Sequence, residues 1–321
     1  MRNTISDLLI APWTTCVLFT AIRLKTFSIL SNREMTAEEI SSSCGAVPRL
    51  LKALLDACDS MGLVISKNGK YMNSHFSKVY LVEGKPHYVG DLIELQYSES
   101  KQWDKLYDIV IGSNNLIDSQ DIEKVNYRTF IRAMNNLGMI GEAEALKNAV
   151  DLSGCKEMVD AGGGSGLYSI VLCQKYPELR STILDVSDAL IVAKELIAGY
   201  KEKERIKFRE TDITKESFGK NIDVVLLSDV VYDESTAAAI LRNAYKSLRQ
   251  NGTLILRGYY SDPDNSKPLF GALFVLGQLV FDPNRKILSI SSLRKYVNDI
   301  GFNAIKISAL TERSMCLIAR K

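Results

Sequence analysis

Histidine is almost missing from this sequence, which has 2 among its 321 residues, His75 and His87. Its 6 cysteines are scattered and never form a Cys-x-x-Cys pair. The ligand spacing of a zinc site is therefore lacking, and we expect no metal centre. We also expect no export signal, because no small-x-small cleavage site follows the first apolar stretch. Such a chain is typical of a protein with reduced thiols, which predicts a cytoplasmic location.

An excess of either charge is lacking too. The chain has 40 Lys and Arg against 38 Asp and Glu, for a net charge of +2. This balance gives no electrostatic footprint for a polyanion, so we expect no nucleic-acid partner. The composition, 46% hydrophobic and 24% charged, is that of an ordinary folded protein. The length suits two domains.

Long hydrophobic runs are scarce. The uncharged run from Leu8 to Ile22 is shorter than the about 20 apolar residues of a spanning helix, and it contains Pro12. We therefore expect no membrane segment. A helix that is buried against a partner is the better interpretation of this run.

Residues 1–100 have the pattern of a winged helix. Thr36 and Glu39 form a capping box before a short helix, a second helix follows Pro48, and Asn68-Gly69 is a hairpin turn. Because winged helices often bind DNA, a transcription regulator is one alternative function. Equal numbers of acidic and basic residues in this region argue against it.

Beyond Cys155 the pattern changes to strands that alternate with helices, which predicts an α/β fold with a mostly parallel sheet. A largely helical stretch, 91–146, precedes it, and a final antiparallel hairpin turns at 311–313. The expected parallel strands are 157–161, 182–185, 207–210, 223–228 and 253–257.

A glycine-rich turn is the most informative motif. In MVDAGGGSGLYSIVLCQKYP a strand ends at Asp160, and Gly162, Gly164 and Gly166 lead into a helix. Glycines here let the backbone approach a ligand and expose the helix N-terminus to it. Proteins that bind NAD or FAD use a similar turn, so a dinucleotide stays an alternative ligand at this point.

Three aspartates at successive strand ends shift the balance. Asp160 can accept hydrogen bonds near the amino-acid end of a cofactor, where a pyrophosphate would be repelled. Asp185 can receive two ribose hydroxyls. Asp212 can accept from an adenine amino group while Ile213 packs against the ring. Since open α/β sheets bind ligands at these strand ends, the combination predicts S-adenosylmethionine as the cofactor.

With these motifs the sequence resembles the plant-type small-molecule O-methyltransferases, which include caffeate and acetylserotonin methyltransferases and bacterial antibiotic-tailoring relatives. The resemblance covers nearly the whole chain. It is carried by the winged-helix region and by the blocks FIRAMNNL, LSGCKEMVDAGGGSG, LRSTILDV, ILRNAYKSLRQNGTLIL and SLRKYVNDIGF.

The resemblance implies a winged-helix dimerisation domain at 1–100, a helical connector at 101–145 that lines the substrate site, and a Rossmann-like class I methyltransferase domain at 146–321. It implies a homodimer with S-adenosylmethionine as cofactor and a small-molecule methyl acceptor. By the same resemblance, the residues that bind the cofactor or line the site near the methyl group are Gly162, Asp185, Asp212, Ile213, Phe130 and Met134.

Two positions depart from the family pattern. Ser228 stands where members often have a lysine that contacts the cofactor. The family's general base is a histidine in a segment like LHDWSDE, whereas this chain has VVYDES. Tyr232 is the nearest match and Asp229 its competitor.

A phenol with a pKa near 10 is a poor base at neutral pH. The acceptor atom, oxygen, nitrogen, sulfur or carbon, therefore stays open. A family member that binds the cofactor without transferring methyl is a second enzymatic alternative.

Overall fold

The computed structural model describes residues 4–112, 126–261 and 268–321. Within it the chain forms two compact units, Met1–Ser100 and Lys101–Lys321. Each has its own hydrophobic core.

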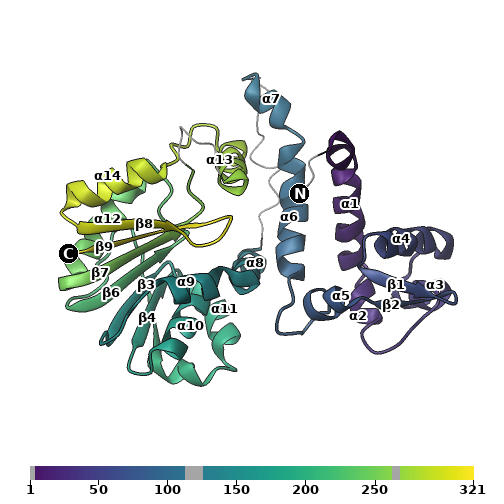
Figure 1. Ribbon diagram of the computed structural model, residues 1–321, viewed down its shortest axis with the longest axis horizontal. Coiled ribbons are helices and arrows are strands. Elements are labelled where there is room, and N and C mark those ends of the chain that lie inside the picture. Colours follow the sequence, from purple (N-terminus) through teal and green to yellow (C-terminus); the bar gives the residue numbers. More distant parts are fainter. Residues whose placement is uncertain (1–3, 113–125, 262–267) are drawn as a thin grey trace. The chain divides into compact units, whose positions relative to one another are not determined.

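The N-terminal unit is mainly helical and holds a small hairpin (Figure 1). Its elements are α1 (Ile5–Arg23), α2 (Thr26–Ile29), α3 (Ala37–Cys44), α4 (Pro48–Ser60), β1 (Val64–Lys67), β2 (Lys70–Asn73), α5 (His75–Tyr80) and the first part of α6 (Gly90–Trp103). The expected capping box starts α3, since Thr36 and Glu39 each accept a hydrogen bond from the other's backbone N–H. Asn68 and Gly69, with φ of 51° and 75°, let β1 and β2 pair antiparallel.

Helix α1 has an apolar surface that its own unit covers only in part. Its C-terminal half supplies Phe19 and Ile22 to the core. The apolar side chains of its N-terminal half, which are 43–73% exposed, are Ile5, Leu8, Leu9, Ile10 and Trp13. Of the described helices, α1 alone has the length and composition to cross a membrane, a test that buried core helices and signal sequences also pass.

The C-terminal unit is an α/β domain around a seven-stranded sheet of order β5-β4-β3-β6-β7-β9-β8. The strands are β3 (Glu157–Ala161), β4 (Arg180–Asp185), β5 (Ile206–Glu210), β6 (Ile222–Ser228), β7 (Leu248–Gly258), β8 (Asn303–Ala309) and β9 (Met315–Arg320). Strands β3 to β7 pair in parallel, whereas β9 pairs antiparallel with both β7 and β8. The predicted parallel sheet with a C-terminal hairpin is confirmed.

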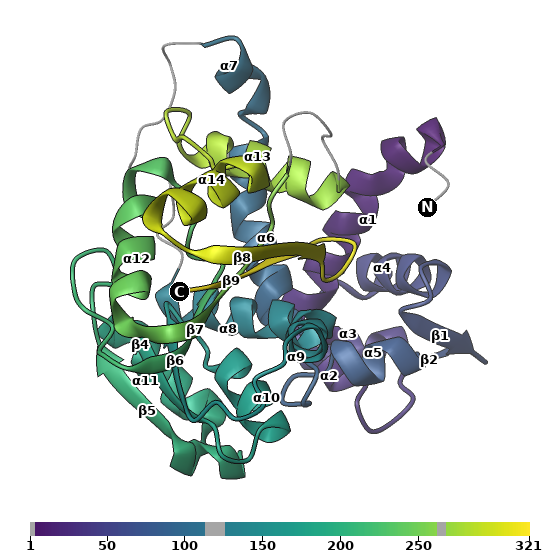
Figure 2. The ribbon, with the colours of Figure 1, turned by 60° about the vertical axis from the view of Figure 1, so that its left-hand side comes forward.

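Helices cover both faces of this sheet (Figures 1 and 2). One face packs against α9 (Ala143–Ala149), α10 (Leu167–Lys175) and α11 (Ser187–Ile197). The other packs against α12 (Glu234–Ser247) and α14 (Ile290–Ile300). Because both faces are covered, the central strands are nearly all apolar, as β6 shows with its buried Val-Val-Leu-Leu run.

The helical stretch expected at 91–146 is broken into several pieces. Helix α6 is followed by α7 (Leu106–Val110), α8 (Tyr127–Leu137) and a π-helical turn (Gly138–Glu142) that leads into α9. Gly141, with φ of 117°, makes the kink in this turn. The part at 113–125 lies outside the described residues. A further helix, α13 (Leu269–Phe281), comes between β7 and α14, and residues 262–267 before it also lie outside the described part.

Candidate active site

The glycine-rich turn forms an open cradle at the carboxyl end of β3. Gly162, Gly164 and Gly166 all have positive φ, at 72°, 51° and 77°, a region that other residues rarely adopt. A Cβ atom on Gly162 would overlap the Val230 side chain, so only glycine fits there. Around Gly164 the nearest atom to a Cβ would be Ile131 Cδ1 at 3.8 Å. The backbone at Gly164 is thus open to a ligand.

Asp185 stands at the end of the neighbouring strand β4 and faces this turn. Its carboxylate accepts hydrogen bonds from the N–H groups of Gly164 and Val186, both at 2.8 Å. Burial raises the pKa of Asp185, and these two bonds oppose the rise. The residue is only partly buried, so one edge of a preoriented carboxylate stays within reach of a ligand.

Asp160 differs from its expected role as a direct cofactor ligand. Its side chain has an exposed fraction of 0% and lies beneath Gly163. Oδ2 accepts from the Ser169 hydroxyl at 2.7 Å, and Oδ1 has no hydrogen-bond partner in the described part of the chain. Burial raises the pKa of Asp160 to about 6. The carboxylate therefore supports the turn from below, held by Ser169 of α10 and out of reach of solvent.

Asp212 and Ile213 follow β5, the strand that pairs with β4. Asp212 accepts from the Thr214 hydroxyl at 2.6 Å and pairs with Lys215 at 2.9 Å, and these contacts lower its pKa to about 2. Ile213 Cδ1 lies 3.5 Å from the Cβ position of Gly162. The structure thus brings Ile213 to the glycine turn, while Asp212 would have to share its carboxylate with Lys215.

Tyr232 and Asp229 form a hydrogen-bonded pair in the loop after β6. The Tyr232 hydroxyl donates to Asp229 Oδ1 and accepts from the Tyr259 N–H at 3.0 Å. Asp229 has a positive φ of 58°, and its N–H donates to the Arg257 carbonyl at 2.9 Å. Both sequence-derived base candidates are thus tied to each other and to the end of β7.

Arg257 lies beside the two base candidates, and the sequence pattern did not predict it there. Its side chain is 1% exposed, and its guanidinium pairs with Asp229 and, at 2.5 Å, with Glu142. It also donates to the Tyr259 hydroxyl at 2.7 Å. An arginine at the end of the apolar run Leu254–Leu256 could have drawn attention to it. No sequence pattern marks Glu142, which lies 115 positions away.

Glu142 is the second carboxylate of this buried network. Burial alone would raise its pKa, but the Arg257 charge and hydrogen bonds from Ser314, Arg257 and Thr311 together hold the pKa below its usual value. The Thr311 hydroxyl donates to Oε1 at 2.8 Å. The network therefore joins the π-helical turn, β7 and the β8–β9 connection.

Two protein-family models match this chain. The family model described as "O-methyltransferase domain" matches residues 90–302, and the model "O-methyltransferase dimerisation domain" matches residues 7–83. The chain belongs to the O-methyltransferase family. It is an S-adenosylmethionine-dependent methyltransferase.

Relatives of this methyltransferase share about a quarter of its residues. The 3-hydroxy-5-methyl-1-naphthoate 3-O-methyltransferase of Streptomyces sahachiroi is 28% identical over 86% of this chain and 82% of the relative. The acetylserotonin O-methyltransferase of Gallus gallus is 27% identical over 95% of this chain and 93% of the relative. The crystal structure of human N-acetylserotonin methyltransferase in complex with SAM has a TM-score of 0.85 at 22% identity, covering 99% of this chain and 96% of that one.

The glycine cradle of this methyltransferase fits its cofactor. The open backbone at Gly164 and the reachable carboxylate of Asp185 suit the hydroxyls of a ribose, and Ile213 offers an apolar contact for a base. When bound, S-adenosylmethionine supplies an electrophilic methyl group on a sulfonium. Ser228 brings no cation to this region, because its side chain is neutral. Its hydroxyl is buried and has no hydrogen-bond partner among the described residues.

Phe130 and Met134, the two residues predicted to line the site near the methyl group, lie on α8. Phe130 is 36% exposed and its ring contacts that of Tyr127 at 6.0 Å between centroids, whereas Met134 is partly buried. Ile131 of the same helix reaches the Gly164 turn. Helix α8 therefore runs beside the cofactor cradle, and Phe130 has surface left for a ligand.

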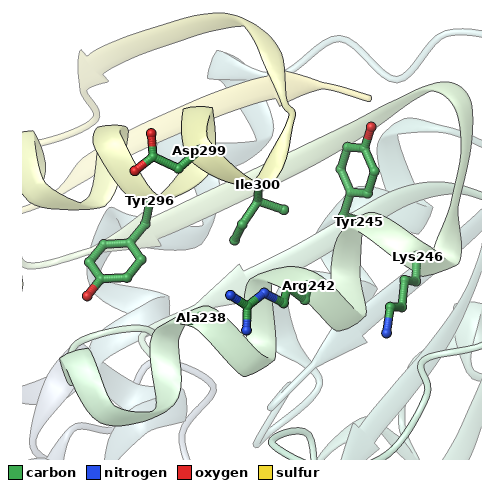
Figure 3. Close-up of a pocket in the computed structure, with 7 residues that line it drawn as sticks. All are labelled: Ala238, Arg242, Tyr245, Lys246, Tyr296, Asp299 and Ile300. Atoms are coloured by element: carbon green, nitrogen blue, oxygen red, sulfur yellow. The ribbon is translucent and has the colours of Figure 1, made fainter.

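A separate pocket of about 340 Å³ lies between α12 and α14 (Figure 3). Arg242, Tyr245 and Lys246 line it from α12, opposite Tyr296 and Asp299 of α14. None of the candidate site residues lines this pocket. It is therefore distinct from the cradle at the carboxyl ends of β3, β4 and β6.

Proposed function

We propose that this methyltransferase transfers a methyl group from S-adenosylmethionine to an oxygen atom of a small aromatic or enolic molecule. The observation that carries the proposal is the Gly164–Asp185 hydrogen bond, which fixes a reachable carboxylate beside an open glycine backbone. The family match and the O-methyltransferase names of the relatives support oxygen as the acceptor atom.

The residues of this chain would act mainly by orienting the cofactor and the methyl acceptor. Methyl transfer is an in-line displacement, so holding the acceptor in line with the methyl group supplies much of the acceleration. The glycine turn and Asp185 would hold the cofactor, and the partly exposed side chains of Phe130 and Met134 on α8 would contact the acceptor. Arg257 and Glu142 would fix the loop that contains Asp229.

We further propose that the N-terminal unit is a winged-helix module that makes a cytoplasmic homodimer. Support comes from the dimerisation-domain match, the α3–α4 pair with its β1–β2 hairpin, and the exposed apolar half of α1. Its balanced charge supports a role without nucleic acid, and we propose no membrane attachment.

Calorimetry and product analysis test the proposed reaction. The chain should bind S-adenosylhomocysteine, and incubation with S-adenosylmethionine and a panel of hydroxyaromatics, amines and thiols should yield S-adenosylhomocysteine with one O-methyl product. Binding of NAD without binding of S-adenosylhomocysteine would contradict the cofactor assignment. Cofactor binding without any methylated product would favour the second candidate, a family member with other chemistry, which the engaged Tyr232–Asp229 pair also favours.

A further inference from the structure

The hydroxyl of Tyr232 is occupied on both sides. It donates to Asp229 and accepts from the Tyr259 N–H at 3.0 Å. The ring is 8% exposed and packs on Tyr260 and Phe274, with centroids 5.2 and 4.8 Å away. Burial raises the pKa of Tyr232 well above its usual value. The phenol therefore keeps its proton at neutral pH and serves as a donor.

The carboxylate of Asp229 is occupied as well. Oδ1 accepts from Tyr232, and Oδ2 pairs with the guanidinium of Arg257. A charge-assisted hydrogen bond to a buried arginine stabilises the ionised form of a carboxylate. Because Arg257 is itself held by Glu142 and Tyr259, Asp229 cannot leave this pair without exposing a buried charge.

Four elements supply the other polar or aromatic groups around Tyr232 and Asp229. They are Arg257, Tyr259 and Tyr260 at the end of β7, Tyr168 on α10, Phe274 on α13, and Glu142 in the π-helical turn. Burial raises the pKa of each of these three tyrosines, that of Tyr259 to about 12. Glu142 is 3% exposed and already accepts from three side chains. Around the pair, the described residues thus leave no unoccupied base.

We propose that the acceptor binds with its hydroxyl already ionised, as the anion of an acidic phenol, enol or carboxylic acid. This inference rests on the proposed O-methyl transfer. The acceptor oxygen forms the new bond to the methyl carbon, and the bond from that carbon to sulfur breaks with its electron pair on sulfur. The anion becomes a neutral ether or ester, S-adenosylhomocysteine leaves neutral, and no proton passes to the protein. Arg257 is shared by Asp229 and Glu142, so these three side chains together carry one net negative charge, and the sulfonium of the bound cofactor is the countercharge for the acceptor anion.

The first test compares two phenols as acceptors. Phenol resembles tyrosine, with a pKa of about 10, whereas 4-nitrophenol is about half ionised at pH 7 and almost fully ionised at pH 9. Between about pH 7 and 9, kcat/KM should rise about tenfold per pH unit for phenol, but no more than about threefold in total for 4-nitrophenol. Asp229→Asn should leave both pH profiles unchanged in shape. A common midpoint for both acceptors that disappears in Asp229→Asn would overturn the proposal.

A second test needs no acceptor. The tyrosinate absorbance of the full chain with S-adenosylhomocysteine is followed from about pH 6 to about pH 9 and compared with Tyr232→Phe, with Tyr260→Phe as the matched control. We expect no ionisation that Tyr232→Phe removes. Ionisation of Tyr232 within this interval would identify a protein base and overturn the proposal.

Failure of the proposed function looks different. If only amines or thiols are methylated, the proposed transfer to oxygen is wrong. The proposal of an ionised hydroxyl as acceptor is then wrong too, even if the tyrosine titration gives the expected result.

Discussion

Asp160, Asp185 and Asp212 stand at the ends of three neighbouring strands, but their surroundings differ. Asp160 is fully buried with a raised pKa, and Asp212 is screened by Thr214 and Lys215 with a pKa lowered to about 2. The carboxylate of Asp185 is held in a fixed orientation by the Gly164 N–H, and it is only partly buried, so a ligand can reach it. Of the three, Asp185 should therefore contribute most directly to cofactor affinity.

Asp185→Asn tests this ranking. The amide keeps the side-chain shape and one acceptor oxygen but loses the charge. Since a hydrogen bond to a charged group contributes about 1.5–3 kcal/mol, we expect affinity for S-adenosylhomocysteine to fall roughly tenfold to a hundredfold by calorimetry. Asp188→Asn, an exposed position in the first turn of α11, is the matched control and should bind normally. Equal affinities of the two variants would contradict the assignment.

Asp160 predicts a pH effect on stability. Its pKa is raised from 3.8 to about 6, so the folded state holds the proton more tightly than the unfolded chain does. Between about pH 4 and 6, rising pH therefore lowers the free energy of unfolding through this group, by about 1.4 kcal/mol per unit of pKa difference. Asp160→Asn removes the titration.

The stability difference between wild type and Asp160→Asn should consequently change across this interval in urea denaturation. Parallel stability profiles would show that Asp160 titrates normally.

The sequence predicted where the three aspartates lie along the strands, but it did not predict how buried or how engaged each carboxylate is. The strand ends that carry the three aspartates follow from the apolar pattern. Whether Asp160 is buried beneath Gly163, or whether Lys215 pairs with Asp212, depends on tertiary packing and on rotamers that the pattern does not encode. Tyr232 shows the same limit, because its partners Asp229 and Tyr259 come from two separate segments.

At the level of elements, the buried arginine network joins pieces that are distant in sequence. Arg257 on β7 links Glu142 in the π-helical turn to Asp229 after β6. Removing one partner of a buried ion pair leaves an uncompensated charge, which is much worse than losing an exposed pair. The network is thus expected to stabilise the edge of the sheet that forms the site.

Arg257→Met should lower the free energy of unfolding by about 3–5 kcal/mol, because Glu142 and Asp229 would lose their common counterion. Arg128→Met is the control: it breaks an exposed pair with Glu195 and should cost less than about 1 kcal/mol. Urea denaturation followed by circular dichroism measures both. Arg257→Lys, which keeps the charge without the fork, should fall between them. Similar losses for Arg257→Met and Arg128→Met would contradict a stabilising network.

Element boundaries show where the pattern was sufficient. Strand β3 has the predicted bounds, and β4, β5 and β6 begin one or two residues earlier than expected. Strand β7 begins at Leu248, five positions before 253, because Leu248 pairs with Ile222 across an irregular register. Such an irregularity depends on the neighbouring strand, and the apolar run alone cannot reveal it.

For the whole molecule, the exposed apolar half of α1 is the main feature that the single chain leaves unexplained. Five large apolar side chains of one helix face solvent there, more than a lone soluble chain usually gathers in one place. Burial in an interface between two copies removes this area from water, and the match to a dimerisation domain supports the same conclusion.

We therefore expect light scattering of the full chain at micromolar concentration to give twice the 35.8 kDa chain mass. Leu9→Glu with Trp13→Glu places two charges in the exposed half of α1 and should shift the chain toward monomer, since unpaired charges are costly to bury. Ile65→Glu is the control, because Ile65 is an exposed apolar residue on β1 and should leave the dimer intact. A wild-type monomer, or dissociation by Ile65→Glu alone, would contradict this interface.

Helix α1 also has the length and composition of a membrane-spanning helix, so flotation with lipid vesicles is measured in parallel. If the wild-type chain floats with the vesicles and the Leu9→Glu, Trp13→Glu variant does not, the apolar surface of α1 binds a bilayer instead of a second copy.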